Sequence, residues 1–454
     1  MKIIKKGTKI NIRPLKIDFM DIFYNFLIQI VEYILGMLAI SSIIQFAGHA
    51  VFGDLTLAVT LTFSLLPITT LGRLLHSMSE LPKVLQNKNK QQLSSYVHWE
   101  LDMVKIVLGV CFLATVIYLG MGYVYSSSFK CLTQACNAHR HVAEDLLLLL
   151  PIALLSQWTS NLLAQSQSPI LSSLVATKTI VFGLVCAVFN YFDIKFSYHI
   201  FLWSLFATFF FMTILQIIIT KIYFFNPNEL SFRVPASPMD SVRTKKFNQE
   251  SLALLTAQIS YIVTSVITYM MIEYWVKDES MLGIYAVTLR LSALVTMLPF
   301  CYLIHLNKLF SVINDTDNLK KFNSDVCRAM LWQVISFVVV LVCVLVGYNS
   351  IKTFFTLGDT GFVPLILMIC FQSLMSLPAA IVHNVLRLNG YARYSFIGNN
   401  IQLVLLIVLG YFMIPNYGIV GAVLATKISL TLPTIGLALI IRKYKLGVKP
   451  WGII

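Results

Sequence analysis

Long apolar runs separated by short polar segments dominate the chain. Twelve runs have about the 20 residues that an α-helix needs to cross a bilayer. They lie at 20–46, 51–75, 103–125, 146–166, 171–192, 198–220, 251–274, 281–305, 329–348, 362–386, 395–414 and 418–441. The segments between them are too short for a sizeable soluble domain. The pattern predicts an all-α polytopic membrane protein with about twelve transmembrane helices.

Composition supports the same class. Of the 454 residues, 57% are hydrophobic and only 12% are charged, about half the charged share of a soluble domain. An ordinary soluble enzyme, a disordered chain and a disulfide scaffold are all excluded. The formal net charge of +14 therefore does not indicate nucleic-acid binding, and the question becomes where the basic residues fall relative to the membrane.

The basic residues are strongly biased to one side of the predicted membrane. An even number of spans puts both termini on one side. With that side inside, the inner segments hold 24 Lys and Arg residues and the outer loops hold five. This bias predicts that both termini are cytoplasmic. The other five basic residues fall within spans, and Arg73 and Lys105 lie near inner helix ends, where a long side chain can snorkel to water.

The polar stretch 221–250 divides the spans into two sets of six. We interpret 1–225 as an N-terminal lobe, 226–250 as a cytoplasmic linker and 251–454 as a C-terminal lobe. Short segments echo each other between the halves: LIQIVEYI at 27–34 matches TAQISYIV at 256–263, and two further weak matches have similar offsets. Two six-helix lobes inserted in the same orientation predict a pseudo-two-fold axis along the membrane normal and a central site, as in alternating-access transporters.

Motifs for enzymatic chemistry are absent from the sequence. There is no GxxxxGK[ST] phosphate loop, no HExxH and no GxSxG. The eight His residues are scattered, and the eight Cys residues show no CxxC or other metal-ligand spacing. We therefore expect no enzymatic activity, no metal and no bound cofactor. Coupling to H⁺ or Na⁺ stays open.

Charged residues deep within spans are costly and normally face a bundle interior or a wet cavity. Glu32 lies near the middle of the first span and is either an ion-coupling carboxylate or half of a structural ion pair. Arg290 and Lys427 lie near mid-depth, and Lys178 is intermediate. These three are candidate cavity bases for an anionic substrate. The alternative for Arg290 and Lys427 is pairing with Glu32 or with a carbonyl group.

Cys131 and Cys136 share the loop KCLTQAC, which the predicted topology places outside. An oxidising compartment would allow them to form a disulfide. Two unpaired thiols are the alternative.

Several stretches resemble a known family. LGIYAVTLRLSALVTMLP (282–299), NGYARYSFIGNN (389–400) and IPNYGIVGAVLATKISL (414–430) are similar to the multidrug/oligosaccharidyl-lipid/polysaccharide (MOP) exporter superfamily. GIYAVTLRL and IPNYGIVGA resemble its Wzx-type polysaccharide flippase branch. Glu32 and AGHAVFGDLTLAV (47–59) instead resemble the MATE branch of cation-coupled drug antiporters.

The resemblance to the flippase branch, which we favour, implies a multi-pass protein of the bacterial inner membrane. Such a protein would translocate undecaprenyl-pyrophosphate-linked oligosaccharide repeat units by alternating access, for O-antigen, lipopolysaccharide or capsule synthesis. A polysaccharide polymerase and glycosyltransferases would be its partners. The MATE resemblance implies a multidrug or metabolite antiporter driven by H⁺ or Na⁺.

Overall fold

A computed structural model of the chain describes residues 19–86, 90–125, 150–163, 181, 184–186, 188, 198–226, 228, 241–299, 301, 316–388, 391–444 and 446–451. Over these residues the fold is all-helical, and each predicted span is helical over most of its described part. Several helices extend beyond the predicted spans, and α2 (Arg73–Gln86) lies almost wholly outside them. The candidate base Lys178 and the candidate disulfide residues Cys131 and Cys136 lie outside the described residues. The number of spans and the side on which the termini lie stay predictions.

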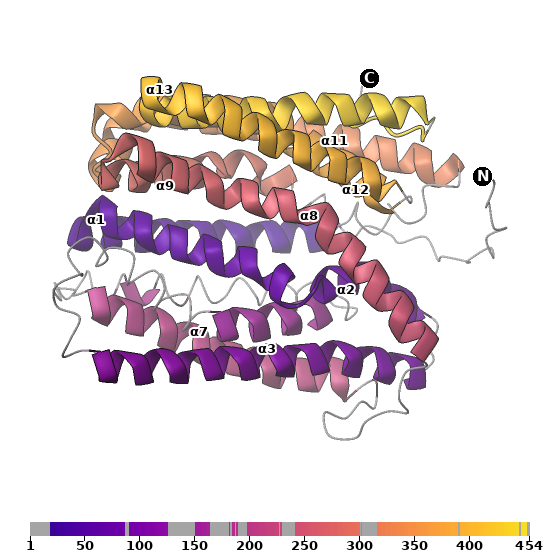
Figure 1. Cartoon of the computed structure of the whole chain (residues 1–454). Coiled ribbons are helices and arrows are strands. Elements are labelled where there is room, and N and C mark those ends of the chain that lie inside the picture. The colour runs from indigo at the N-terminus through magenta and orange to yellow at the C-terminus, as the bar shows by residue number, and fades with distance from the viewer. Residues whose placement is uncertain are drawn as a thin grey trace.

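The helices of the first half of the chain lie in the middle and lower part of Figure 1. They are α1 (Phe19–Thr69), α2 (Arg73–Gln86), α3 (Lys90–Tyr125), a helix at 150–163, α7 (Tyr198–Thr220) and the short π-helix η1 (Lys221–Phe225). α1 contains two predicted spans joined at Gly48, whose φ of 86° and ψ of 168° break the helix. The left-handed φ there suits glycine, which has no Cβ to clash.

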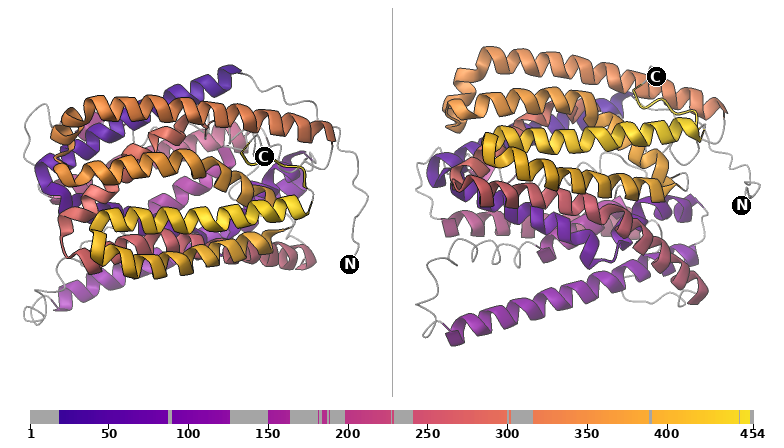
Figure 2. Two further views of the ribbon diagram at one scale, coloured as in Figure 1. Left: turned by 90° about the horizontal axis from the view of Figure 1, so that it is seen from above. Right: turned by 45° about the horizontal axis from the view of Figure 1, so that its top comes forward.

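The helices of the second half lie mostly in the upper part of Figure 1. They are α8 (Ser241–Val276), α9 (Glu279–Ser292), α11 (Thr316–Phe355), the 3₁₀ turn η2 (Asp359–Gly361), α12 (Phe362–Leu388) and α13 (Ala392–Lys443). α13 also joins two spans, at Gly418, where φ is 55° and ψ is −129°. It packs against α8 and α12, and Figure 2 shows α12 beside it.

Apolar side chains face outward along many of these helices. Phe211 of α7 is 67% exposed, Val346 of α11 is 84% exposed and Leu439 of α13 is 61% exposed. So much exposed apolar surface is characteristic of helices solvated by lipid rather than water. By length and composition, the described residues contain six helical segments that can cross a bilayer, and the segment Arg393–Lys443 is long enough to cross twice.

Three hydrophobic clusters hold the helices together. One lies within the N-terminal group and contains Leu81, Tyr96, Trp158 and Phe225, and a second lies within the C-terminal group around Phe322, Val385 and Ile441. The third crosses between the groups: it packs Ile43 and Phe52 of α1 with Leu282 and Val287 of α9. α1 and α9 therefore form the main contact between the two lobes.

α8 links the lobes in a different place. It runs obliquely from the C-terminal group to the end of α2 and α3 (Figure 1). Its first turns, 241–251, which we call the α8 arm, lie in the segment interpreted from the sequence as linker, so the last ten residues of that segment are helical. Phe247 of the arm belongs to the N-terminal hydrophobic cluster.

Candidate functional site

The contact between α1 and α9 places Arg290 at the interface of the two lobes. Arg290 lies in the last turn of α9, which is interrupted at Ala293 before helix resumes at 294–299. The Tyr33 hydroxyl of α1 donates a hydrogen bond to the Arg290 carbonyl oxygen at 2.9 Å. Nearby, the Cys301 thiol donates to Gln29 Oε1 at 3.2 Å. These bonds hold α9 and the chain that follows it against the middle of the first span.

The Arg290 side chain is exposed. Its guanidinium is close enough to the Tyr33 and Tyr269 hydroxyls to interact with them electrostatically. Among the described residues, no carboxylate forms an ion pair with Arg290. A planar guanidinium that is available beside phenolic hydroxyls is suited to binding a phosphate or carboxylate in a bidentate manner.

Lys427 has a different environment. It lies in the second part of α13, is 7% exposed, and its Nζ donates to the Gln372 side-chain oxygen of α12 at 2.8 Å. Gln333 of α11 joins the same region by donating to the Gln372 and Ser373 carbonyl oxygens at 3.1 and 2.6 Å. Lys427 is thus solvated by an amide within the C-terminal lobe, whereas Arg290 is exposed at the lobe interface. In the part of the chain that the structure describes, no hydrogen-bond partner is shared by the two bases.

Glu32 is half-buried in α1, adjacent to Tyr33, and is engaged in a polar interaction. Its position one residue from the Tyr33–Arg290 contact puts a carboxyl group and a guanidinium at the same helix pair. Both interpretations made from the sequence, coupling carboxylate and structural partner, remain compatible with this position.

The two halves of the chain are in direct contact at the kink of α1 around Gly48, where the two spans of α1 meet at one end of the bundle. The Ser41 hydroxyl donates to the Phe354 carbonyl oxygen at 2.7 Å, and His49 Nε2 lies 3.2 Å from the Thr356 carbonyl oxygen and 3.0 Å from its hydroxyl. Gly283 of α9 packs directly on the His49 backbone. The predicted topology puts this end on the outer side, so the structure has the lobes closed there.

Comparison with solved structures gives this arrangement a precedent. The chain superposes on a ligand-bound MATE multidrug transporter, DinF-BH, with a TM-score of 0.69, 11% identity, and coverage of 94% of this chain and 95% of that one. An inward-facing MATE transporter of the MOP superfamily superposes with a TM-score of 0.67 and 11% identity, and the match covers 91% of this chain and 95% of that one. The lipid II flippase MurJ, in an inward closed conformation, superposes with a TM-score of 0.63 and 14% identity, and the match covers 94% of this chain and 90% of that one.

The chain has the fold of MOP superfamily transporters. No protein-family model matches it and no curated protein is significantly similar to it in sequence. At such low identities the superpositions establish the fold and do not separate the branches of the superfamily. The three similar proteins are transporters or flippases, not enzymes.

The structure also contains a polar junction that the sequence did not single out, between the α8 arm and α2 and α3. Arg73 was expected to snorkel to water, but it is half-buried and its guanidinium contacts protein groups. Nη1 donates to the Trp99 carbonyl oxygen at 2.5 Å and Nη2 donates to the Asn248 side-chain oxygen at 3.3 Å. The guanidinium carbon also lies 4.4 Å from the Trp99 ring centroid. Lys105, by contrast, is exposed and pairs with Asp102 at 3.6 Å.

The signal for this junction was present but weak. The pair Trp99–Glu100 stands directly before an apolar run, and Asn248 and Glu250 stand directly before another. Residues at the ends of apolar runs usually lie in the interface and contact water. Only the packing of helices distant in sequence shows that this set is enclosed.

Proposed function

We propose that the chain is an inner-membrane flippase that moves undecaprenyl-pyrophosphate-linked oligosaccharide repeat units by alternating access. The observation that carries the proposal is the exposed Arg290 guanidinium at the lobe interface, with no carboxylate ion pair among the described residues. A pyrophosphate provides the acceptor oxygens that an arginine fork binds best. The lipid tail would extend into the bilayer between the lobes.

Lys427 and Lys178 are further candidate contacts for the pyrophosphate in this proposal. Lys427 is a second contact that becomes available when its ammonium leaves Gln372. Lys178 is a third contact, proposed from the sequence alone. In this arrangement Arg290 receives the headgroup and Lys427 holds it as the lobes rearrange.

Deletion of the gene provides the first test of the proposal. Loss of surface polysaccharide, together with accumulation of undecaprenyl-linked repeats on the inner face, is expected. Arg290→Ala, expressed in the deletion strain, should reduce export about 10- to 100-fold, since a hydrogen bond to a charged group contributes about 1.5–3 kcal/mol. Arg393→Ala is the matched control, because Arg393 is exposed at the start of α13. Normal export by both variants would remove Arg290 from substrate binding.

A MATE-type antiporter is the second candidate, and Glu32 is the observation in its favour. A half-buried carboxyl group in α1, adjacent to a residue that bridges the lobes, is placed to couple ion binding to lobe movement. Glu32→Gln should abolish the dependence of drug efflux on the H⁺ or Na⁺ gradient, measured in proteoliposomes, while protein insertion stays normal. Gradient-driven efflux that persists in Glu32→Gln would leave Glu32 a structural partner.

A further inference from the structure

The junction between the α8 arm and the N-terminal lobe encloses an acidic group that the proposed transport mechanism does not use. Glu100 of α3 is 1% exposed, and it lies outside the helical segments that are apolar enough to cross a bilayer. Among the described residues, neither carboxyl oxygen has a hydrogen-bond partner. Ser77, Tyr96 and Trp158 lie near enough to interact with the carboxyl group.

An ionised carboxylate is expensive in such a place, so the neutral acid is favoured. Burial raises the pKa of Glu100 to about 8, although Ser77, Tyr96, Trp158 and Arg73 act in the opposite direction. Glu100 therefore holds a proton over the lower part of the physiological pH range. A buried acid that titrates near neutral pH can act as a switch if a path and a moving part are connected to it.

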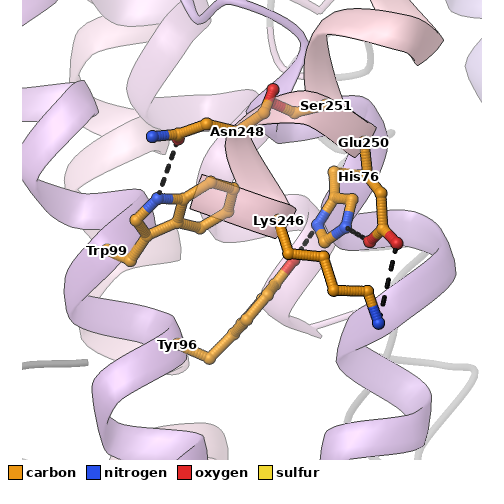
Figure 3. A network of polar contacts seen from close by, with 7 residues as sticks. All are labelled: His76, Tyr96, Trp99, Lys246, Asn248, Glu250 and Ser251. Carbon is orange, nitrogen blue, oxygen red and sulfur yellow. Dashed lines mark hydrogen bonds and ion pairs between the residues drawn. The ribbon is translucent and has the colours of Figure 1, made fainter. Parts of the chain in front are cut away.

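Glu100 interacts with Tyr96, and from Tyr96 a chain of polar groups leads through His76 to Glu250 (Figure 3). Tyr96 Oη lies 3.0 Å from His76 Nδ1, and His76 Nε2 lies 3.2 Å from Glu250 Oε2 of the α8 arm. Tyr96 and His76 are 0% and 2% exposed, whereas the Glu250 side chain is 44% exposed. Glu250 thus provides the surface end of a path whose other members are buried.

We infer that Glu100 is a proton-binding site, reached from Glu250 through His76 and Tyr96, and that its occupancy controls docking of the α8 arm on the N-terminal lobe. The arm belongs to the helix that enters the C-terminal lobe, so docking joins the lobes at the end opposite Gly48. The inference concerns regulation and does not depend on which molecule is transported.

One proton can pass along this path from Glu250 to Glu100 without a net change in the protonation of His76 or Tyr96. A protonated Glu250 gives its proton to His76 Nε2, His76 Nδ1 releases a proton to the Tyr96 oxygen, and the Tyr96 hydroxyl proton passes to the Glu100 carboxylate. Glu250 ends ionised, Glu100 ends neutral, and His76 changes only its tautomer. In the final arrangement Nε2–H donates to Glu250 and Tyr96 donates to Nδ1, which agrees with the two observed distances.

The α8 arm covers this path. Phe247 is 4% exposed, and its ring centroid lies 5.1 Å from that of His76 and 5.5 Å from that of Tyr96. Asn248 next to it accepts hydrogen bonds from Trp99 Nε1 and Arg73. Release of the arm would admit water to His76 and Tyr96 and, through them, to Glu100.

The direction of the pH effect follows from linkage. In the released form a hydrated Glu100 would return toward the ordinary glutamate pKa, so the docked form binds more protons between that value and about 8. Rising pH therefore favours release, by up to about tenfold for each pH unit inside this window. The other charged or titratable groups that face the site are Arg73, His76 and Glu80 from α2, Tyr96 and Asp102 from α3, and Lys246 and Glu250 from α8.

Infrared spectroscopy of the purified full-length protein in lipid nanodiscs tests proton binding directly. A carboxyl C=O band should disappear as the pH rises from about 6 to about 9, as expected for a raised carboxyl pKa, and Glu100→Gln should remove that band. Asp102→Asn, two residues away and exposed, is the matched control and should retain it. If no titrating carboxyl band depends on Glu100, the proposal that Glu100 is a proton-binding site is refuted.

Docking is measured in the same preparations by the distance between spin labels at Lys90→Cys and Arg243→Cys, both exposed positions, after replacement of the eight native cysteines. The docked fraction should fall with rising pH in the otherwise unmodified chain and in Asp102→Asn. Glu100→Gln should stay docked throughout, and His76→Gln should retain the pH response if Glu100 is its source. A response that survives in Glu100→Gln, or no response in the unmodified chain, would refute control of docking. Because no substrate is present, failure here leaves the proposed transport function untouched.

Discussion

At the scale of single residues, two backbones approach closely where α1 meets α9. A Cβ added at Gly283 would lie 2.2 Å from the His49 carbonyl oxygen and 2.8 Å from its carbonyl carbon. Because these are backbone atoms at the kink of α1, no side chain can rotate away. Glycine is therefore required here for the contact between lobes.

Gly283→Ala should destabilise the closed arrangement by about 1–3 kcal/mol, the usual cost of overpacking a well-packed contact. The expected result is a lower unfolding temperature in detergent, monitored by a thiol-reactive dye that reports exposure of the buried cysteines, such as Cys186 and Cys301. Gly347→Ala in α11 is the control, because a Cβ there meets nothing within 4 Å. It should leave stability unchanged or raise it slightly, since alanine favours helix by about 0.5–1 kcal/mol. Equal unfolding temperatures for the two variants would contradict the tight contact.

Individual residues also show where sequence reasoning ended. Lone charges within apolar runs identified Glu32, Arg290 and Lys427, because a charge in such a run is conspicuous. Their surroundings were not predictable: Lys427 bonds to Gln372, 55 positions away, and no local pattern encodes that pairing. Glu100 was missed because an acid at the end of an apolar run looks like an interfacial residue, and only its contacts with α2 and the helix at 150–163 enclose it.

At the scale of elements, apolar length was the reliable signal. It predicted α7 and α12 closely, because a helix in lipid must satisfy all its backbone hydrogen bonds internally. The span predicted at 329–348 located α11, but that helix extends from Thr316 to Phe355. Helix ends were predicted less well. The second predicted span ran to 75, but α1 ends at Thr69, and the positive φ values of Leu71 and Gly72 turn the chain into α2.

The α8 arm shows why the polar linker was predicted only in part. Its sequence SVRTKKFNQE has one large aromatic side chain, Phe247, among polar and charged residues. Such a segment has too few apolar residues to indicate an amphipathic helix by itself. Its helix is stabilised by Phe247 packing against His76, Tyr96 and Trp99 of the other lobe, and tertiary packing of this kind is not visible in local sequence.

At the scale of the whole molecule, the two lobes are joined near both ends. α1 contacts α9 and α11 at the end that carries Gly48, and the α8 arm contacts α2 and α3 at the other. Under the proposed alternating access these two contacts would open in turn, because a substrate can leave only on a side where the lobes separate. The contact of α1 with α9 is the larger and contains the shared hydrophobic cluster, so its separation is the step that a covalent link would block most directly.

A disulfide between Gly53→Cys and Leu282→Cys should block that separation. A Cβ built at Gly53 lies 3.1 Å from Leu282 Cβ, slightly shorter than the range of about 3.5–4.5 Å that disulfides adopt, so a small outward shift allows the bond. Oxidation should produce a mobility shift on a non-reducing gel and abolish export of surface polysaccharide, and reduction should restore both. Gly398→Cys with Leu437→Cys is the control pair, since these positions pack against each other within the C-terminal lobe and their link should leave export intact. If the cross-linked α1–α9 pair still exports, the lobes do not need to part at this end, and the substrate must cross by a route that keeps α1 and α9 together.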